Sequence, residues 1–334
     1  MKQGIGILAV RALAAAARRP RVRLALQVAA VAVLLVSLAY GVRGSWRDAG
    51  ERLRSADPAA LALGLVLIAA YYLAFTVGWR MILRAMGVRL GYRDSLRSEM
   101  LSLLAKYVPG GVWTPAARVI AVRRLGVTDT PLVLGSIALE AGLSAIAGVL
   151  VFAAGMTTVS STDTPIGWLI GFAVAAAVLL HPRVFQPATR AILRPFGGGS
   201  VPQLSQGTML LLVGYYCLTW LLAGAGLFFV VASVGDPSPS AVLYLGGTSA
   251  VGAIVAVLVF VSPSGLGVRE GATYTLLLAV VSPAAALGAV VVNRLAITLV
   301  EVLLLVVVGV APRGTPDDTQ QELAENPAPS TAQA

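Results

Sequence analysis

Runs of apolar residues long enough to cross a bilayer recur along almost the whole chain. A helix needs about 20 such residues to span the hydrocarbon layer. Charged residues make up only 12% of the 334 residues and hydrophobic residues 57%, whereas a soluble domain is about 25% charged. No segment between the runs is long enough to bury a soluble core of its own. The sequence therefore predicts an all-α protein, a polytopic bundle of transmembrane helices.

We expect the spans in the apolar ranges that have basic flanks, at 24–42, 58–79, 131–152, 165–180, 207–234, 240–261 and 284–310. The run at 268–281 is shorter. As a helix it is roughly 21 Å long, less than the ~30 Å hydrocarbon core. If unwound backbone extends it, the chain has about eight crossings and both ends inside. If it re-enters, the chain has about seven crossings and its C-terminus lies outside.

The formal net charge is +10, and the basic residues gather between the apolar runs. This placement favours the anionic cytoplasmic leaflet as their partner and argues against nucleic acid. The loop-charge rule places the N-terminus in the cytoplasm. We expect a basic cytoplasmic segment at 1–23, a transmembrane domain at 24–311 and a disordered tail at 312–334. All basic residues except Lys2 and Lys106 are Arg. This bias fits a bacterial plasma-membrane protein.

Cysteine and histidine chemistry is nearly absent from the sequence. There is one Cys, Cys217, and one His, His181. A single Cys forms no intrachain disulfide, and no Cys/His cluster has the spacing of metal ligands. No catalytic residues, metal or cofactor are therefore expected.

Two segments break the helical pattern at membrane depth. The stretch 98–113 includes Lys106, Pro109, Gly110 and Gly111 and has Arg on both sides, so it is predicted to be a re-entrant or interfacial element. The stretch 262–270 contains Gly265 and Gly267, followed by Arg269 and Glu270. Non-helical backbone in a membrane persists only where it lines a cavity or is buried in protein, and paired interruptions mark binding sites in transporters. The helix that begins near residue 268 is expected to direct its N-terminus at a phosphate.

Three charged residues lie inside predicted spans: Glu140, Arg294 and Glu301. Each costs on the order of 3 kcal/mol to insert, so it should face a partner or a cavity. We expect Glu140 to pair with Arg294, or Arg294 and Glu301 to face a water-filled groove. A purely structural ion pair between helices is the alternative.

Taken together, Gly78-Trp79-Arg80, the segment 106–113 with Arg118, Glu140, and the segment 263–270 resemble the lysylphosphatidylglycerol synthase transmembrane (flippase-like) family. The resemblance covers about residues 20–312. It implies a bundle like the lipid-flipping domain of the multiple peptide resistance factor. No soluble synthase domain is expected after residue 312, so lipid aminoacylation is not implied. The resemblance suggests Lys106, Arg118, Arg269 and Arg294 as head-group contacts, with Glu140, Glu270 and Glu301 as counter-charges.

The leading hypothesis is a protein, not an enzyme, that binds an anionic lipid and moves it between leaflets. The lipid is a phospholipid or a polyprenyl phosphate. One alternative is a membrane glycosyltransferase that uses a lipid-linked sugar, with Asp48, Glu51 or Asp57 as its outer carboxylate. Another is a non-transporting partner of a lipid or cell-envelope enzyme. A homo-oligomer is also compatible with the sequence.

Overall fold

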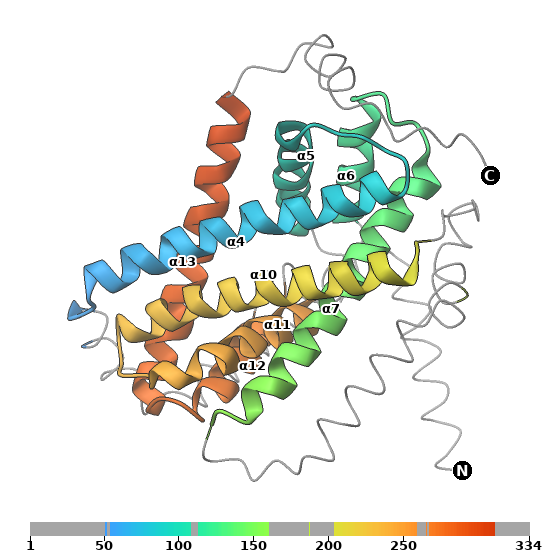
Figure 1. Cartoon of the computed structure of the whole chain (residues 1–334). Coiled ribbons are helices and arrows are strands. Elements are labelled where there is room, and N and C mark those ends of the chain that lie inside the picture. The colour runs from blue at the N-terminus through green and yellow to red at the C-terminus, as the bar shows by residue number, and fades with distance from the viewer. Residues whose placement is uncertain are drawn as a thin grey trace, which may run out of the picture.

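The computed structural model describes residues 51, 54–107, 113–159, 187, 204–258, 265 and 267–310. Within these ranges every regular element is a helix (Figure 1), which confirms the predicted all-α class. The predicted N-terminal segment, the spans at 24–42 and 165–180, and the tail lie outside the described residues.

In the described part, five helical segments are long and apolar enough to cross a membrane, judged by length and composition. They confirm the predicted spans at 58–79, 131–152, 207–234, 240–261 and 284–310. These segments are α4 (Pro58–Ala85), α7 (Thr130–Met156), α10 (Gln206–Ala232), the 3₁₀ turn η4 (Pro239–Ala241) with α11 (Val242–Leu258), and α13 (Pro283–Val310).

Local sequence fixes where these helices begin and end. The Asp57 carboxylate accepts a hydrogen bond from the Ala59 N–H at 2.8 Å, and Pro58 occupies the first turn, where its missing N–H costs nothing. α4 ends before Gly87, whose φ of 84° is the left-handed conformation typical of a residue just past a helix C-terminus. Asp129 caps α7 in the same way, accepting from the Leu132 N–H at 3.0 Å.

The long helices of the bundle run in both directions. α10 runs antiparallel beside α4 (Figure 1), and the Asp57 N–H at the start of α4 donates to the Ser233 carbonyl just after α10 at 2.9 Å.

Close contact between helices is achieved with small residues, as is common in membranes. At Gly224 on α10, an added Cβ would lie 2.5 Å from the Cα of Gly246 on α11.

Large apolar side chains also cover the outer surface of the bundle. Leu218, for example, is 64% exposed and Leu295 is 65% exposed. In water such a surface would be a strong association site. In a bilayer it is the expected lipid-facing surface, so the exposed side chains support the membrane assignment.

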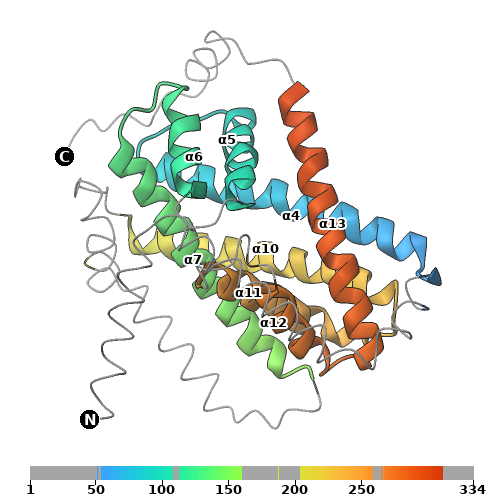
Figure 2. The ribbon, with the colours of Figure 1, turned by 180° about the vertical axis from the view of Figure 1, so that it is seen from behind.

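The first broken segment belongs to a helical hairpin. α5 (Tyr92–Leu104) continues into the 3₁₀ turn η2 (Ala105–Tyr107), and α6 (Trp113–Arg123) packs against both. The hairpin begins beside the end of α4, where the Arg80 side chain donates to the Leu90 carbonyl, and it leads back to the start of α7. Both of its ends therefore lie at one end of the bundle (Figure 2), in agreement with the re-entrant element predicted at 98–113. The hairpin is longer than predicted, and α6 was not anticipated as a helix.

The second broken segment belongs to another hairpin, formed by α11 and α12 (Val268–Leu277). The Tyr244 hydroxyl, near the start of α11, donates to the Leu276 carbonyl, near the end of α12, at 3.0 Å. An added Cβ at Gly235, just beyond α10, would lie 2.9 Å from the Cβ of Ala285 in α13. α13 therefore starts at the end of the bundle where α11 starts.

Candidate functional site

Polar side chains from two other parts of the chain converge on Glu301 in α13. The Lys106 ammonium group, at the inner end of the first hairpin, forms an ion pair with Glu301 Oε1. The Tyr72 hydroxyl donates to the same oxygen from the middle of α4. Glu301 is only 6% exposed. Its charge is thus balanced inside the bundle by a basic group carried on a re-entrant hairpin.

The second hairpin contributes Glu270, whose two carboxylate oxygens have different partners. Oε1 lies 3.3 Å from an Arg294 nitrogen on α13. Oε2 accepts the Gly267 N–H at 2.6 Å, at the N-terminus of α12. Gly267 and Gly265 have φ values of 82° and 68°, which strain any residue with a side chain. The first donor of α12 is therefore already occupied, so a phosphate there would have to bind through other groups.

Arg269 completes this arrangement. It lies within electrostatic reach of Lys106 and Tyr72, and Arg294 is also within reach of Lys106. Arg269 and Arg294 line one small pocket of about 10 Å³, which is roughly the space that one water molecule needs. The remaining lining residues are Glu270, Thr273, Val290, Asn293 and Ile297.

We call Tyr72, Lys106, Arg269, Glu270, Arg294 and Glu301 the polar centre. Its three basic side chains face two carboxylates, so one positive charge is in excess. In the described ranges no ion pair or hydrogen bond is found for Arg269, while the other two basic residues are paired. This excess, inside an otherwise apolar bundle, suits an anionic group better than a cation.

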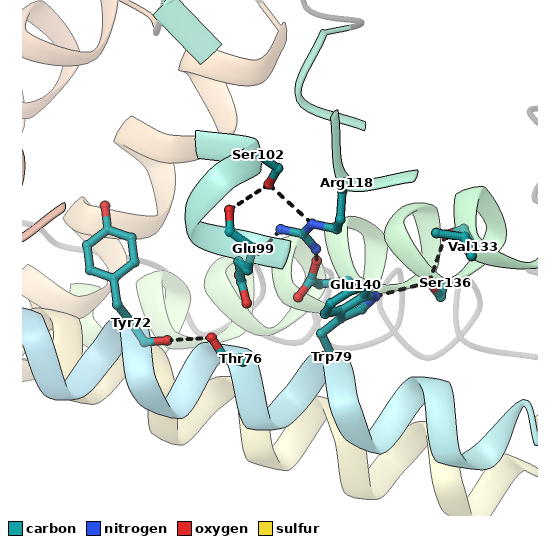
Figure 3. Close-up of polar contacts among 9 residues, drawn as sticks. All are labelled: Tyr72, Thr76, Trp79, Glu99, Ser102, Arg118, Val133, Ser136 and Glu140. Carbon is teal, nitrogen blue, oxygen red and sulfur yellow. Dashed lines mark hydrogen bonds and ion pairs between the residues drawn. The ribbon is translucent and has the colours of Figure 1, made fainter. Parts of the chain in front are cut away.

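A separate set of charges fixes the first hairpin to α7 (Figure 3). Arg118 on α6 lies 2.5 Å from Glu140 Oε2 on α7 and 3.4 Å from Glu99 Oε1 on α5. The guanidinium lies over the Trp79 ring, 4.7 Å from its centroid. Glu99, Arg118 and Glu140 are 3%, 6% and 4% exposed. We call these three residues the arginine cluster.

The predicted pairing of Glu140 with Arg294 is wrong. Arg118 is the partner of Glu140, and Arg294 contacts Glu270. The sequence gives no sign of this pairing, because α6, the helix that carries Arg118 and packs against α7, is not anticipated from the pattern. The three acidic residues that the resemblance suggested as counter-charges each contact one of the suggested basic residues.

The structure thus divides the predicted site residues into two groups. Lys106, Gly265, Gly267, Arg269, Glu270, Arg294 and Glu301 belong to the polar centre or its backbone, and Arg118 and Glu140 belong to the arginine cluster. Pro109, Gly110 and Gly111 lie outside the described residues. Whether any of these residues contacts a lipid stays a prediction.

Sequence reasoning missed Tyr72 and Glu99, and it named Trp79 only as part of the family resemblance, without its contact to Arg118. Tyr72 and Trp79 read as ordinary residues of an apolar span, and Glu99 follows a run of Arg that is typical of a solvated loop. One signal was present for Glu99. It lies three and seven residues before Ser102 and Lys106, and this spacing places all three on one helix face.

The structure describes two of the three carboxylates that were proposed for a glycosyltransferase. Asp57 caps α4, Glu51 is exposed and Asp48 lies outside the described residues. In the described part of the chain, no group of three His, Cys, Asp or Glu is placed to hold a metal ion.

Comparison with known proteins adds a family assignment. A search among curated proteins gave no match to this chain. The family model described as the lysylphosphatidylglycerol synthase transmembrane region matches residues 24–304. This match covers most of the chain and includes both hairpins and the polar centre. The chain therefore belongs to the lysylphosphatidylglycerol synthase transmembrane-region family.

Proposed function

We propose that this protein binds the anionic head group of a membrane lipid at the polar centre and moves the lipid between leaflets. The lipid is a phospholipid or a polyprenyl phosphate. The family is lipid-related, which supports a role with lipids but does not specify movement. We further propose that the protein is located in a bacterial cell membrane, with its N-terminus in the cytoplasm.

The observation that carries this proposal is the excess of one positive charge at the polar centre. Arg269 adds a third basic group to two existing ion pairs, Lys106 with Glu301 and Arg294 with Glu270. A guanidinium group can hold two phosphate oxygens at once. A phosphate bound at Arg269 would cancel the excess charge without breaking either pair.

The two hairpins support movement rather than static binding. They enter the bundle from opposite ends, and their inner residues, Lys106 and Arg269, lie within electrostatic reach of each other. A shift of one hairpin would be enough to expose a head group, held between the two, to one end of the bundle. The lipid tails would remain at the apolar outer surface.

A lipid-scrambling assay tests the proposal. The purified protein is reconstituted into vesicles of phosphatidylcholine that contain fluorescent phosphatidylglycerol, and transbilayer movement is followed by dithionite quenching. Arg269→Gln should slow phosphatidylglycerol movement at least tenfold, because it removes the excess charge and leaves both ion pairs intact. A parallel assay uses a fluorescent polyprenyl phosphate.

Arg84→Gln is the matched control, because Arg84 is exposed in the last turn of α4, about three helical turns beyond Tyr72. It should leave the rate unchanged. If Arg269→Gln moves both lipids at the wild-type rate, the polar centre is not the head-group site. Equal movement of phosphatidylcholine would exclude selectivity for anionic lipids.

A further inference from the structure

The arginine cluster has one base for two acids. In the described part of the chain, Arg118 is the basic side chain that forms ion pairs with Glu99 and Glu140. If both carboxyl groups were ionised, the cluster would hold a net negative charge among side chains no more than 6% exposed. An uncompensated charge in such an environment is strongly unfavourable. Two carboxyl groups that share one site instead retain a proton between them.

Unpartnered polar atoms mark the same place. Among the described residues, no hydrogen-bond partner is found for the buried atoms Glu99 Oε2 and Glu140 Oε1 or for the buried Tyr216 hydroxyl. An added Cβ at Gly78, the neighbour of Trp79, would lie 2.7 Å from that hydroxyl. Tyr216 also interacts electrostatically with all three members of the cluster. Buried polar atoms without partners are rare, and a carboxyl proton would supply a donor to this group.

No other ionisable group in the described ranges removes the imbalance. The titratable side chains that face the two carboxyl groups are Arg118 from α6, Tyr71 from α4, Tyr92 from α5 and Tyr216 from α10. Tyrosine is neutral near pH 7. Arg118 is thus the sole cation among them, and a bound proton is the simplest source of the missing positive charge.

The position of the proton has a mechanical consequence. Glu99 and Arg118 belong to the same hairpin, whereas Glu140 belongs to α7. With the proton on Glu99, the Arg118 charge is held by Glu140 and the hairpin is fixed to α7, which matches the shorter distance of 2.5 Å. With the proton on Glu140, Arg118 pairs within its own hairpin, and this link to α7 is weakened.

We propose that Glu99 and Glu140 hold one exchangeable proton, and that a change of its site from Glu99 to Glu140 by exchange with water couples a proton gradient to movement of the hairpin that carries Lys106. In this exchange the Glu99 O–H bond breaks and its proton goes to water, and Glu140 forms an O–H bond with a proton taken from water, so the pair holds one proton before and after the step. The coupling rests on the proposed lipid transport, but the proton site itself does not.

Infrared spectroscopy tests the proton site without any lipid transport. The detergent-purified full-length protein at pH 7 should show the C=O stretch of a buried protonated carboxyl group. Either Glu99→Gln or Glu140→Gln should remove or shift this band, and Glu51→Gln, at an exposed residue, should not. The absence of the band from the wild-type protein, or its presence unchanged in both variants, would overturn the proposal.

Proteoliposomes test the coupling. A pH gradient should change the rate of phosphatidylglycerol movement by the wild-type protein at least threefold, and Glu99→Gln should move the lipid at a rate independent of the gradient. A wild-type rate that responds to a sodium gradient and not to pH would overturn the coupling. Failure of all lipid movement, with the carboxyl band present, would contradict the proposed function and leave the proton site intact.

Discussion

Removal of Arg118 should destabilise the protein more than removal of its two acidic partners. In Arg118→Met, Glu99 and Glu140 lose the cation that lies 3.4 and 2.5 Å from them. Breaking a buried pair by removing one partner costs about 3–5 kcal/mol. Loss of the contact with the Trp79 ring adds about 0.5–2 kcal/mol. We therefore expect the free energy of unfolding to fall by about 3.5–7 kcal/mol.

The control for this prediction is a triple variant that also carries Glu99→Gln and Glu140→Gln. Replacing all charges of a buried cluster with neutral groups of similar volume is often close to neutral, so the triple variant should regain most of the lost stability. The assay is reversible unfolding in mixed micelles with increasing SDS. A loss below about 1 kcal/mol for Arg118→Met, or a triple variant as unstable as the single one, would refute the assignment of Arg118 as the buried counter-ion.

Three further predictions use the same unfolding assay. Gly224→Ala should lower the free energy of unfolding by about 1–3 kcal/mol, because its Cβ would collide with the backbone of α11. The control Gly214→Ala should cause no measurable loss, because no atom lies within 4 Å of its Cβ. Equal effects of the two variants would contradict the close packing of α10 and α11. Asp57→Ala should cost about 1 kcal/mol through loss of the cap and leave function intact, and loss of function at normal stability would favour the glycosyltransferase alternative. Tyr72→Phe should cost about 1.5–3 kcal/mol, because Glu301 loses a donor, and an unchanged stability would contradict this contact.

The apolar pattern predicted most of the described spans because burial in lipid leaves a strong signal in sequence. The breaks around Gly110 and Gly265 were recognised as special for the same reason, since Pro and Gly interrupt long helices. The sequence does not decide whether the segment 268–281 crosses or re-enters, because one basic residue, Arg313, is the only indication of the side of the C-terminus.

Partners in the candidate site were harder to predict. Glu140 was recognised as needing a counter-charge, but its partner comes from α6, a short and polar helix that resembles a basic loop. Glu99 was missed because α5, the helix that carries it, also resembles a basic loop in sequence. Ion-pair partners depend on how helices pack in three dimensions, and spacing along the chain does not determine this when the hairpins between spans are unrecognised.

Native mass spectrometry of the gently extracted protein tests the central claim most directly, because it identifies the lipid that remains bound at the polar centre. The wild-type protein and Arg84→Gln should retain an anionic lipid, and Arg269→Gln should lose it while staying folded. Equal retention by Arg269→Gln, or a wild-type protein that carries zwitterionic lipids as readily as anionic ones, would contradict the account.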